Sequence, residues 1–151
     1  MAVKPIPDGY HTITPYVIVE GALEVMEFLK KAFDAKEIGE TMKSPDGKLR
    51  HGELQIGNSR MMISEACSEN KPMPAMYYLY VEDCDKAYAS AIKAGGVSIK
   101  EPANQFYGDR SGGVRDSAGN QWWVGTHVED VSPEEMKKRM AEQSKEKAHA
   151  K

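Results

Sequence analysis

The sequence predicts an α+β protein: two βαβββ modules that form a curved mixed sheet, followed by a charged C-terminal helix. Two observations lead to this fold class. A short hydrophobic strand followed by an amphipathic helix occurs twice along the chain. After each helix the pattern changes to the alternation that is typical of strands. With 151 residues the chain fits one domain, expected at residues 1–131, with a separate tail at 132–151.

The repeat is clearest in its first strands. Tyr16-Val17-Ile18-Val19-Glu20 is similar to Tyr78-Leu79-Tyr80-Val81-Glu82, which begins 62 positions later. A similarity of this period that occurs only twice indicates duplication of a supersecondary unit. We therefore expect module one at about residues 12–66 and module two at about 75–129. The polar segment between them, with its two prolines, is predicted to be a linker.

Each module is predicted to contain one helix. In module one, apolar side chains recur at helical spacing from Leu23 to Phe33. In module two, the helix is expected from Asp83 to Ala94. Asp83 or Asp85 can cap its first turn, and Gly95-Gly96 is a typical helix end.

Three strands are expected after each helix. In module one they cover residues 35–38, 49–56 and 60–65. In module two the first begins at Val97, and the other two cover residues 112–116 and 120–127. Asp46-Gly47 is predicted to form a hairpin turn before the second strand of module one.

The segment from Ser132 onward predicts a separate charged helix. Ser132, Pro133 and Glu135 fit the N-cap, N1 and N3 positions of a capping box. Few apolar residues follow, so we expect this helix to be solvent-exposed, to pack weakly, and to fray before Lys151.

Side chains alternate between the two faces of a strand, so the pattern also predicts a sheet face that no helix covers. We call it the open face. It is expected to contain six polar or aromatic side chains: Tyr16, His51, Glu53, Tyr78, Tyr80 and Trp123. Aromatic walls with a few polar groups are typical of small-molecule pockets. The alternative is that these side chains fill an interface between sheets.

Composition excludes several classes of function. The net charge of −3 and the absence of a basic stripe argue against nucleic-acid and anionic-membrane partners. The N-terminal residues lack the apolar run of a secretory signal, and no segment has the ~20 apolar residues that cross a bilayer. Cys67 and Cys84 form no CxxC motif, so neither a disulfide framework nor a zinc site is indicated. We expect a cytoplasmic protein.

Several segments together resemble a known family. They are Thr14-Pro15-Tyr16, Arg50-His51-Gly52-Glu53-Leu54, the run from Phe106 to Gly112, and Arg115-Asp116 with Gly119. In this order and spacing they are similar to the vicinal oxygen chelate superfamily, also called glyoxalase/bleomycin-resistance proteins, and within it to the PhnB-like branch. The resemblance implies that paired modules curl into a U-shaped sheet, usually in a homodimer. It leaves open whether the sheet closes within one chain or between two.

The resemblance also implies where a metal would bind in metal-dependent members of the superfamily. Those positions fall on Thr14, on or beside Ser64, on Met76 and on Trp123. Divalent metals prefer imidazole and carboxylate ligands, which these residues do not supply. Glu65 reaches the second position if the register shifts by one residue, but one carboxylate does not hold a catalytic metal. We therefore expect no cofactor, with a divalent metal as the alternative.

Two further sets of side chains are candidates for chemistry. His51 and Glu53 are two residues apart on one strand face, within ~7 Å, which suits a general-base histidine held by a carboxylate. The alternative is a surface ion pair. Arg110, in a glycine-containing segment, could bind a ligand carboxylate or phosphoryl group. Its alternative is an ion pair with Asp109 or Asp116 that shapes the loop.

The sequence thus favours a metal-free protein that binds a planar or aromatic small molecule. The ligand-binding candidates are the six open-face residues and Arg110. The alternative is a glyoxalase-like lyase, dioxygenase or thiol transferase that uses a divalent metal or the His51/Glu53 pair. A structural interaction module ranks third.

Overall fold

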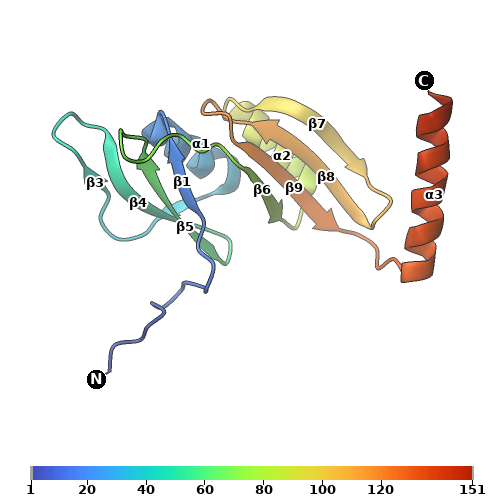
Figure 1. Ribbon diagram of the computed structural model, residues 1–151, viewed down its shortest axis with the longest axis horizontal. Helices are drawn as coiled ribbons and strands as arrows, with labels where there is room; N and C mark the ends of the chain where they lie inside the picture. Colours follow the sequence, from blue (N-terminus) through green and yellow to red (C-terminus); the bar gives the residue numbers. More distant parts are fainter. Residues whose placement is uncertain (1, 151) are drawn as a thin grey trace.

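A computed structural model describes residues 2–150 and confirms the predicted α+β class (Figure 1). Met1 and Lys151, the outer limits of the predicted domain and tail, lie outside the described residues. Module one contains β1 (Tyr16–Val19), α1 (Ala22–Phe33), β2 (Lys36–Glu37), β3 (Met42–Lys43), β4 (Leu49–Ile56) and β5 (Ser59–Glu65). Module two contains β6 (Met76–Tyr80), α2 (Cys84–Lys93), β7 (Val97–Asn104), β8 (Asp109–Arg115) and β9 (Gln121–His127), and α3 (Pro133–His149) follows.

Each module forms its own mixed sheet with the same topology. The strand order is β1-β5-β4-β2 in module one, where β3 also pairs with β4, and β6-β9-β8-β7 in module two. In both sheets the first strand runs parallel to the last strand of the module, so that Tyr16 lies beside Met62 and Tyr78 beside Trp123. The duplication seen in the sequence is therefore a duplication of strand pairing.

The two modules share one core because their helices pack against each other. Val17, Val19 and Leu54 are fully buried beneath α1, as the alternation predicts. Trp122 joins the modules. Its ring stacks on that of Tyr77 with the centroids 4.5 Å apart, and its centroid lies 6.1 Å from that of Phe33 in α1. The helix-covered faces are thus the interior of the molecule.

Within residues 2–150, no helix covers the other faces of the two sheets. In Figure 1 the sheets lie side by side, and no strand of residues 2–150 pairs across the module boundary. Tyr16, Met76 and Tyr80, all on these faces, are 45%, 61% and 69% exposed. The U-shaped sheet expected from the resemblance is therefore not closed within one chain.

Module two differs from the prediction in the length of its strands. β8 begins at Asp109 rather than at residue 112, and β7 continues to Asn104. Gly112 in β8 suggests a loop from the sequence, but in the structure it allows β7 and β8 to approach closely. A Cβ on Gly112 would lie 2.9 Å from the backbone nitrogen of Pro102 in β7, too close for any side chain. The two-residue β3 was also not predicted.

The last strand of each module caps the helix of that module. The Glu65 carboxylate at the end of β5 accepts hydrogen bonds from the backbone N–H groups of Gly21 and Ala22, each at 2.9 Å. In module two, Thr126 Oγ1 accepts from the backbone N–H of Cys84 at 2.9 Å, and Asp83 caps the first turn of α2 as predicted. These bonds satisfy donors that a helix start leaves free.

The tail forms the predicted capped helix, which stands apart from the sheets (Figure 1). Ser132 Oγ accepts a hydrogen bond from the backbone N–H of Glu135 at 3.2 Å. Arg139 binds Glu129, Glu135 and the carbonyl of Phe106, which attaches the start of α3 to the β7–β8 turn. No residue of α3 is buried, as expected for a solvated helix.

Cys67 is exposed, Cys84 is buried, and both are free thiols. Within residues 2–150, no helix combines the length and the hydrophobicity required to span a bilayer.

The capping role of Glu65 predicts a measurable loss of stability. Replacing Glu65 with Ala leaves the N–H groups of Gly21 and Ala22 at the start of α1 without their acceptor, so the free energy of unfolding should fall by about 1–2 kcal/mol in urea denaturation. The exposed Glu69 provides the matched control, and Glu69→Ala should change it by less than about 0.5 kcal/mol. Equal effects of the two variants would contradict the capping role.

Candidate functional site

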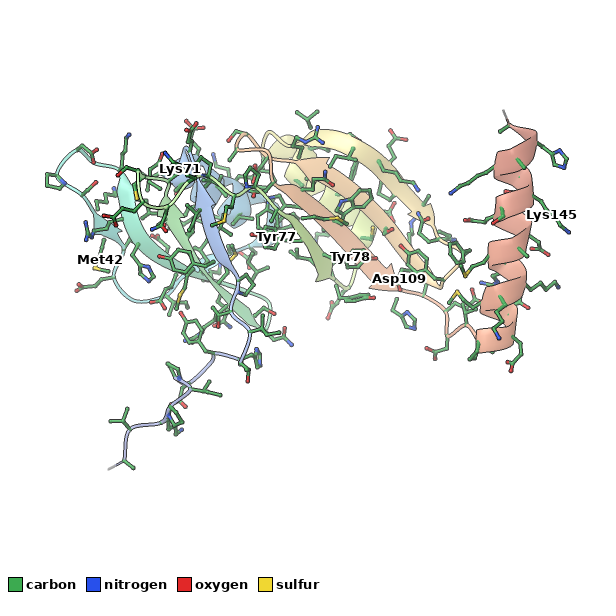
Figure 2. The ribbon with its side chains drawn as sticks, in the orientation of Figure 1. Met42, Lys71, Tyr77, Tyr78, Asp109 and Lys145 are labelled. Atoms are coloured by element: carbon green, nitrogen blue, oxygen red, sulfur yellow. The ribbon has the colours of Figure 1, made fainter. Side chains whose placement is uncertain are left out.

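The open face of module two is organised around one buried carboxylate. Asp109 begins β8, and its side chain is only 5% exposed. Its Oδ2 atom accepts hydrogen bonds from the hydroxyls of Tyr78 and Tyr80, both at 3.0 Å. Its Oδ1 atom lies 2.9 Å from Nδ1 of His127 at the end of β9. Asp109 therefore joins three strands on this face, β6, β8 and β9 (Figure 2).

His127 lies between two carboxylates, and this determines the charges of the cluster. Its Nε2 atom is 2.8 Å from Asp130, and its other nitrogen faces Asp109. Asp130 first, and then Asp109, raise the pKa of His127 above its ordinary value. Burial by itself would raise the pKa of Asp109, but hydrogen bonds from His127, Tyr78 and Tyr80 outweigh it and lower that pKa. The hydrogen bonds within the cluster are thus strongest when Asp109 is anionic and His127 is protonated.

Two glycines allow aromatic rings to lie flat on this face. A Cβ on Gly125 would come within 2.1 Å of the Tyr78 hydroxyl, and one on Gly113 would come within 2.7 Å of the Trp123 ring. Tyr78 and Tyr80 have ring centroids 5.2 Å apart. The result is an aromatic surface whose tyrosine hydroxyls are fixed by Asp109. Burial, followed by the bond to Asp109, raises the pKa of Tyr78, so its hydroxyl stays protonated at neutral pH.

The open face of module one carries a second, smaller polar cluster. The Tyr16 hydroxyl lies 3.0 Å from Nδ1 of His51, and the Tyr10 hydroxyl donates a hydrogen bond to Glu53. Beyond Tyr16, a pocket of about 490 Å³ is lined by residues that include Arg50 and Ser64. Both clusters therefore combine tyrosines with a histidine and a carboxylate.

The structure brings most of the predicted site residues together, but in two groups. Tyr16 and His51 are in contact on module one, and Tyr78 and Tyr80 are in contact beside Trp123 on module two. The two groups belong to separate sheets, one in each module. No hydrogen bond joins His51 to Glu53 within residues 2–150, since each side chain binds a tyrosine instead.

Arg110 lies away from these groups. Its guanidinium forms a bidentate ion pair with Asp85 of α2, with bonds of 2.7 and 2.9 Å. The expected alternative partners were therefore wrong: Asp109 binds the tyrosines and His127, whereas Asp116 accepts from Asn120 and Trp122. Neighbouring positions of β8 point to opposite faces, so Asp109 faces the open side and Arg110 faces the helix.

Sequence reasoning missed Asp109 and Tyr10. The glycines that flank Asp109 predict a loop there, and only the extension of β8 reveals which face Asp109 occupies. The available signal was the Tyr-x-Tyr spacing in β6 together with His127, which indicated a face in need of a polar partner. Tyr10 lies in a terminal segment without periodicity, and no local pattern predicts its contact with Glu53.

The residues at the expected metal positions do not fit a divalent metal. Thr14, Met76 and Trp123 supply no imidazole or carboxylate. The strand register places Met62, rather than Ser64, at the position that corresponds to Trp123. Glu65 is engaged by the start of α1. Across residues 2–150, no group of three or more His, Cys, Asp or Glu side chains has a geometry that could hold a metal ion.

Comparisons with known proteins agree with this architecture. The model of the "Glyoxalase/Bleomycin resistance protein/Dioxygenase superfamily" matches residues 11–124. The uncharacterized protein Mb0911c of Mycobacterium bovis is 32% identical over 142 residues, which cover 87% of this chain and 93% of that protein. The uncharacterized protein Rv0887c of Mycobacterium tuberculosis is also 32% identical, over 87% of this chain and 83% of that protein.

Solved structures show the same fold at low sequence identity. TioX from Micromonospora sp. ML1 has a TM-score of 0.60 at 19% identity, over 77% of this chain and 99% of that chain. A Bacillus cereus PhnB protein, described as a putative 3-demethylubiquinone-9 3-methyltransferase, has a TM-score of 0.62 at 16% identity. The match covers 77% of this chain and 99% of that chain. The fosfomycin resistance protein FosX from Mesorhizobium loti has a TM-score of 0.56 at 17% identity, over 77% and 91%.

The position of His127 predicts a pH-dependent contribution to stability. Its folded pKa is raised above 6.5, so the stabilisation is complete below about pH 6.5 and is lost as the pH rises through the raised pKa. The same stabilisation weakens in acid, when the pH falls toward the lowered pKa of Asp109 and its carboxylate becomes protonated. Urea unfolding should therefore show the largest difference between wild type and His127→Gln between about pH 4.5 and 6.5.

The exposed His149 in the last turn of α3 supplies the control for this experiment. His149→Gln changes an exposed side chain and should give only a small difference in stability. A difference for His127→Gln that stays constant from pH 5 to pH 9 would mean that His127 does not interact with the two carboxylates in its charged form.

Proposed function

Since the chain belongs to the glyoxalase/bleomycin resistance protein/dioxygenase superfamily, we propose that it binds a planar or aromatic small molecule on its open faces without a metal. One observation carries this proposal. The open faces present exposed tyrosines whose hydroxyls are fixed by charged or polar side chains, so the rings are preorganised. Preorganised aromatic rings bind a planar ligand with little loss of side-chain entropy.

The pocket is proposed to be completed by a second copy of the chain. In a single chain no helix of residues 2–150 covers the open faces, which expose tyrosines together with Met42 on module one and Met76 on module two. Tyrosine and methionine are enriched in protein interfaces. A homodimer that places module one of one copy opposite module two of the other would join the two aromatic groups around one ligand.

An enzymatic function has less support from the geometry. The His51/Glu53 pair would need a bond from the carboxylate to the imidazole, but Tyr16 binds His51 and Tyr10 binds Glu53. Both nitrogens of His127 face carboxylates, which leaves no free nitrogen for a substrate. A metal-dependent reaction would need ligands that the four expected positions do not supply.

We further propose that the chain belongs to the PhnB-like branch of the superfamily and acts in the cytoplasm. The support for the branch is the set of sequence segments from Thr14 to Gly119, together with the fold similarity to the Bacillus cereus PhnB protein. FosX, a fosfomycin resistance protein, gives one example of this fold in resistance to an antibiotic. A library of aromatic and anionic metabolites and antibiotics is therefore the appropriate screen.

The proposal predicts that a ligand from this library raises the melting temperature of the wild-type protein. Tyr80→Ala removes the most exposed ring of the aromatic surface, so the affinity for that ligand should fall by about tenfold. Titration calorimetry with the ligand found in the screen measures this change.

Tyr88 provides the control, because it lies on α2 and its hydroxyl donates to Ser98, away from the open face. Tyr88→Phe should leave the affinity unchanged. No stabilisation by any aromatic or anionic compound, or equal losses for Tyr80→Ala and Tyr88→Phe, would contradict the proposal. Light scattering tests the proposed homodimer separately and should give twice the mass of one chain.

A further inference from the structure

The N-terminal segment places one of its own side chains on the open face of module one. Tyr10 donates its hydroxyl hydrogen to Glu53, which lies 43 residues later on β4. Tyr10 is half-buried, while residues 2–9 are exposed and extend away from the sheets (Figure 1). The phenol ring therefore occupies a place on the face that a small molecule could also occupy.

The groups that hold this ring belong to the sheet. The guanidinium carbon of Arg60 lies 5.2 Å from the ring centroid, within the range of a cation–π contact. Arg60 Nε donates to Gln55 at 3.1 Å, so the neighbouring strand contributes to the orientation of the guanidinium. Glu53 and Gln55 lie on β4 and Arg60 lies on β5. A carboxylate and a guanidinium are thus fixed on two paired strands, with a phenol between them.

The chemistry of this contact is specific for a neutral phenol. Burial, with the Glu53 carboxylate as the next cause, raises the pKa of Tyr10 to about 12. The hydroxyl therefore remains a hydrogen-bond donor at neutral pH, which is what a carboxylate acceptor requires. The guanidinium binds the ring face, which attracts cations.

The rest of the segment is weakly attached. Val3, Ile6 and Ile13 are 93%, 47% and 85% exposed, so none of them is anchored in the core. Apart from Tyr10, the segment is tied to the sheet by the bond from Arg60 to the carbonyl of Asp8, at 2.9 Å. Displacing Tyr10 therefore requires the loss of few contacts.

We propose that Glu53 and Arg60 form a phenol-binding subsite, and that Tyr10 occupies it as an internal ligand which an incoming phenol must displace. This inference rests on the proposed function, because the subsite is one end of the same open face. It defines the ligand class as a compound with an aromatic ring and a neutral hydroxyl donor. It also makes Tyr10 a competitor that limits the affinity of weak ligands.

The test uses the full chain with Tyr10→Ala and 4-methylphenol, which reproduces the lost side chain. Titration calorimetry should show at least tenfold tighter binding of 4-methylphenol by the variant than by wild type. Toluene, which lacks the hydroxyl, should bind the variant at least tenfold more weakly, because it leaves the carboxylate without its donor. Methyl NMR of Met62, which pairs with Glu53 in the sheet, should report the binding.

Two further variants make the test specific. His11→Ala changes an exposed neighbour on the same segment and should not open the subsite. Gly9 has a φ of +83°, and a Cβ there would lie 2.4 Å from Cζ of Arg60, so Gly9→Val should push the segment off the sheet while Tyr10, Glu53 and Arg60 all remain in the sequence. This variant should also gain affinity for 4-methylphenol. N-acetyl-tyrosinamide is the second compound. If it binds more tightly than 4-methylphenol, the subsite recognises a tyrosine within a peptide. If it binds more weakly, the subsite recognises a free phenolic small molecule.

The inference is overturned if neither Tyr10→Ala nor Gly9→Val gains affinity, or if toluene and 4-methylphenol bind equally well. It is also overturned if Tyr10→Ala with Glu53→Leu binds 4-methylphenol as tightly as Tyr10→Ala alone. These outcomes are separate from the library screen on the wild-type protein. A screen without hits leaves the gain of phenol binding measurable, and a ligand on module two can be found even if Tyr10 proves irrelevant.

Discussion

One helix covers only one face of each four- or five-stranded sheet, and this constraint determines how the rest of the molecule is arranged. In both modules the covered face becomes the core, because α1 and α2 pack against each other with Trp122 between the modules. The other face of each sheet must then be stable in contact with water, with a partner, or with a ligand. Its tyrosines, histidines and carboxylates are side chains that suit all three.

The charged groups of the open faces hold the aromatic rings in place. Asp109 fixes two tyrosine hydroxyls at once and is itself oriented by His127. Gly113 and Gly125 leave the space in which the rings of Trp123 and Tyr78 lie. A small molecule that stacks on this surface meets rings that are already ordered, so binding costs little side-chain entropy. Module one repeats the principle with different residues, because the Tyr16 hydroxyl lies beside His51.

The sequence was sufficient for the fold and for most of the aromatic side chains of the open faces. Periods of two and of about 3.6 residues are local signals, and they located β4, α1 and the faces of Val17 and Tyr16 correctly. What it could not supply were contacts between distant segments. The pairing of Arg110 with Asp85 depends on how β8 crosses α2, and the contact of Tyr10 with Glu53 depends on the path of a terminal segment. Gly112 gave a misleading signal, because a glycine that allows two strands to approach resembles a glycine in a loop.

The central claim is that the uncovered faces meet in the functional protein, and methionine methyl groups test it most directly. Met76 on the open face and Met140 on α3 are similarly exposed in a single chain, at 61% and 53%. We expect a soluble paramagnetic relaxation agent to broaden the NMR signal of the Met140 methyl several-fold more than that of Met76, because a second copy covers Met76. Equal broadening of both methyl signals at concentrations where the protein is fully assembled would contradict the account.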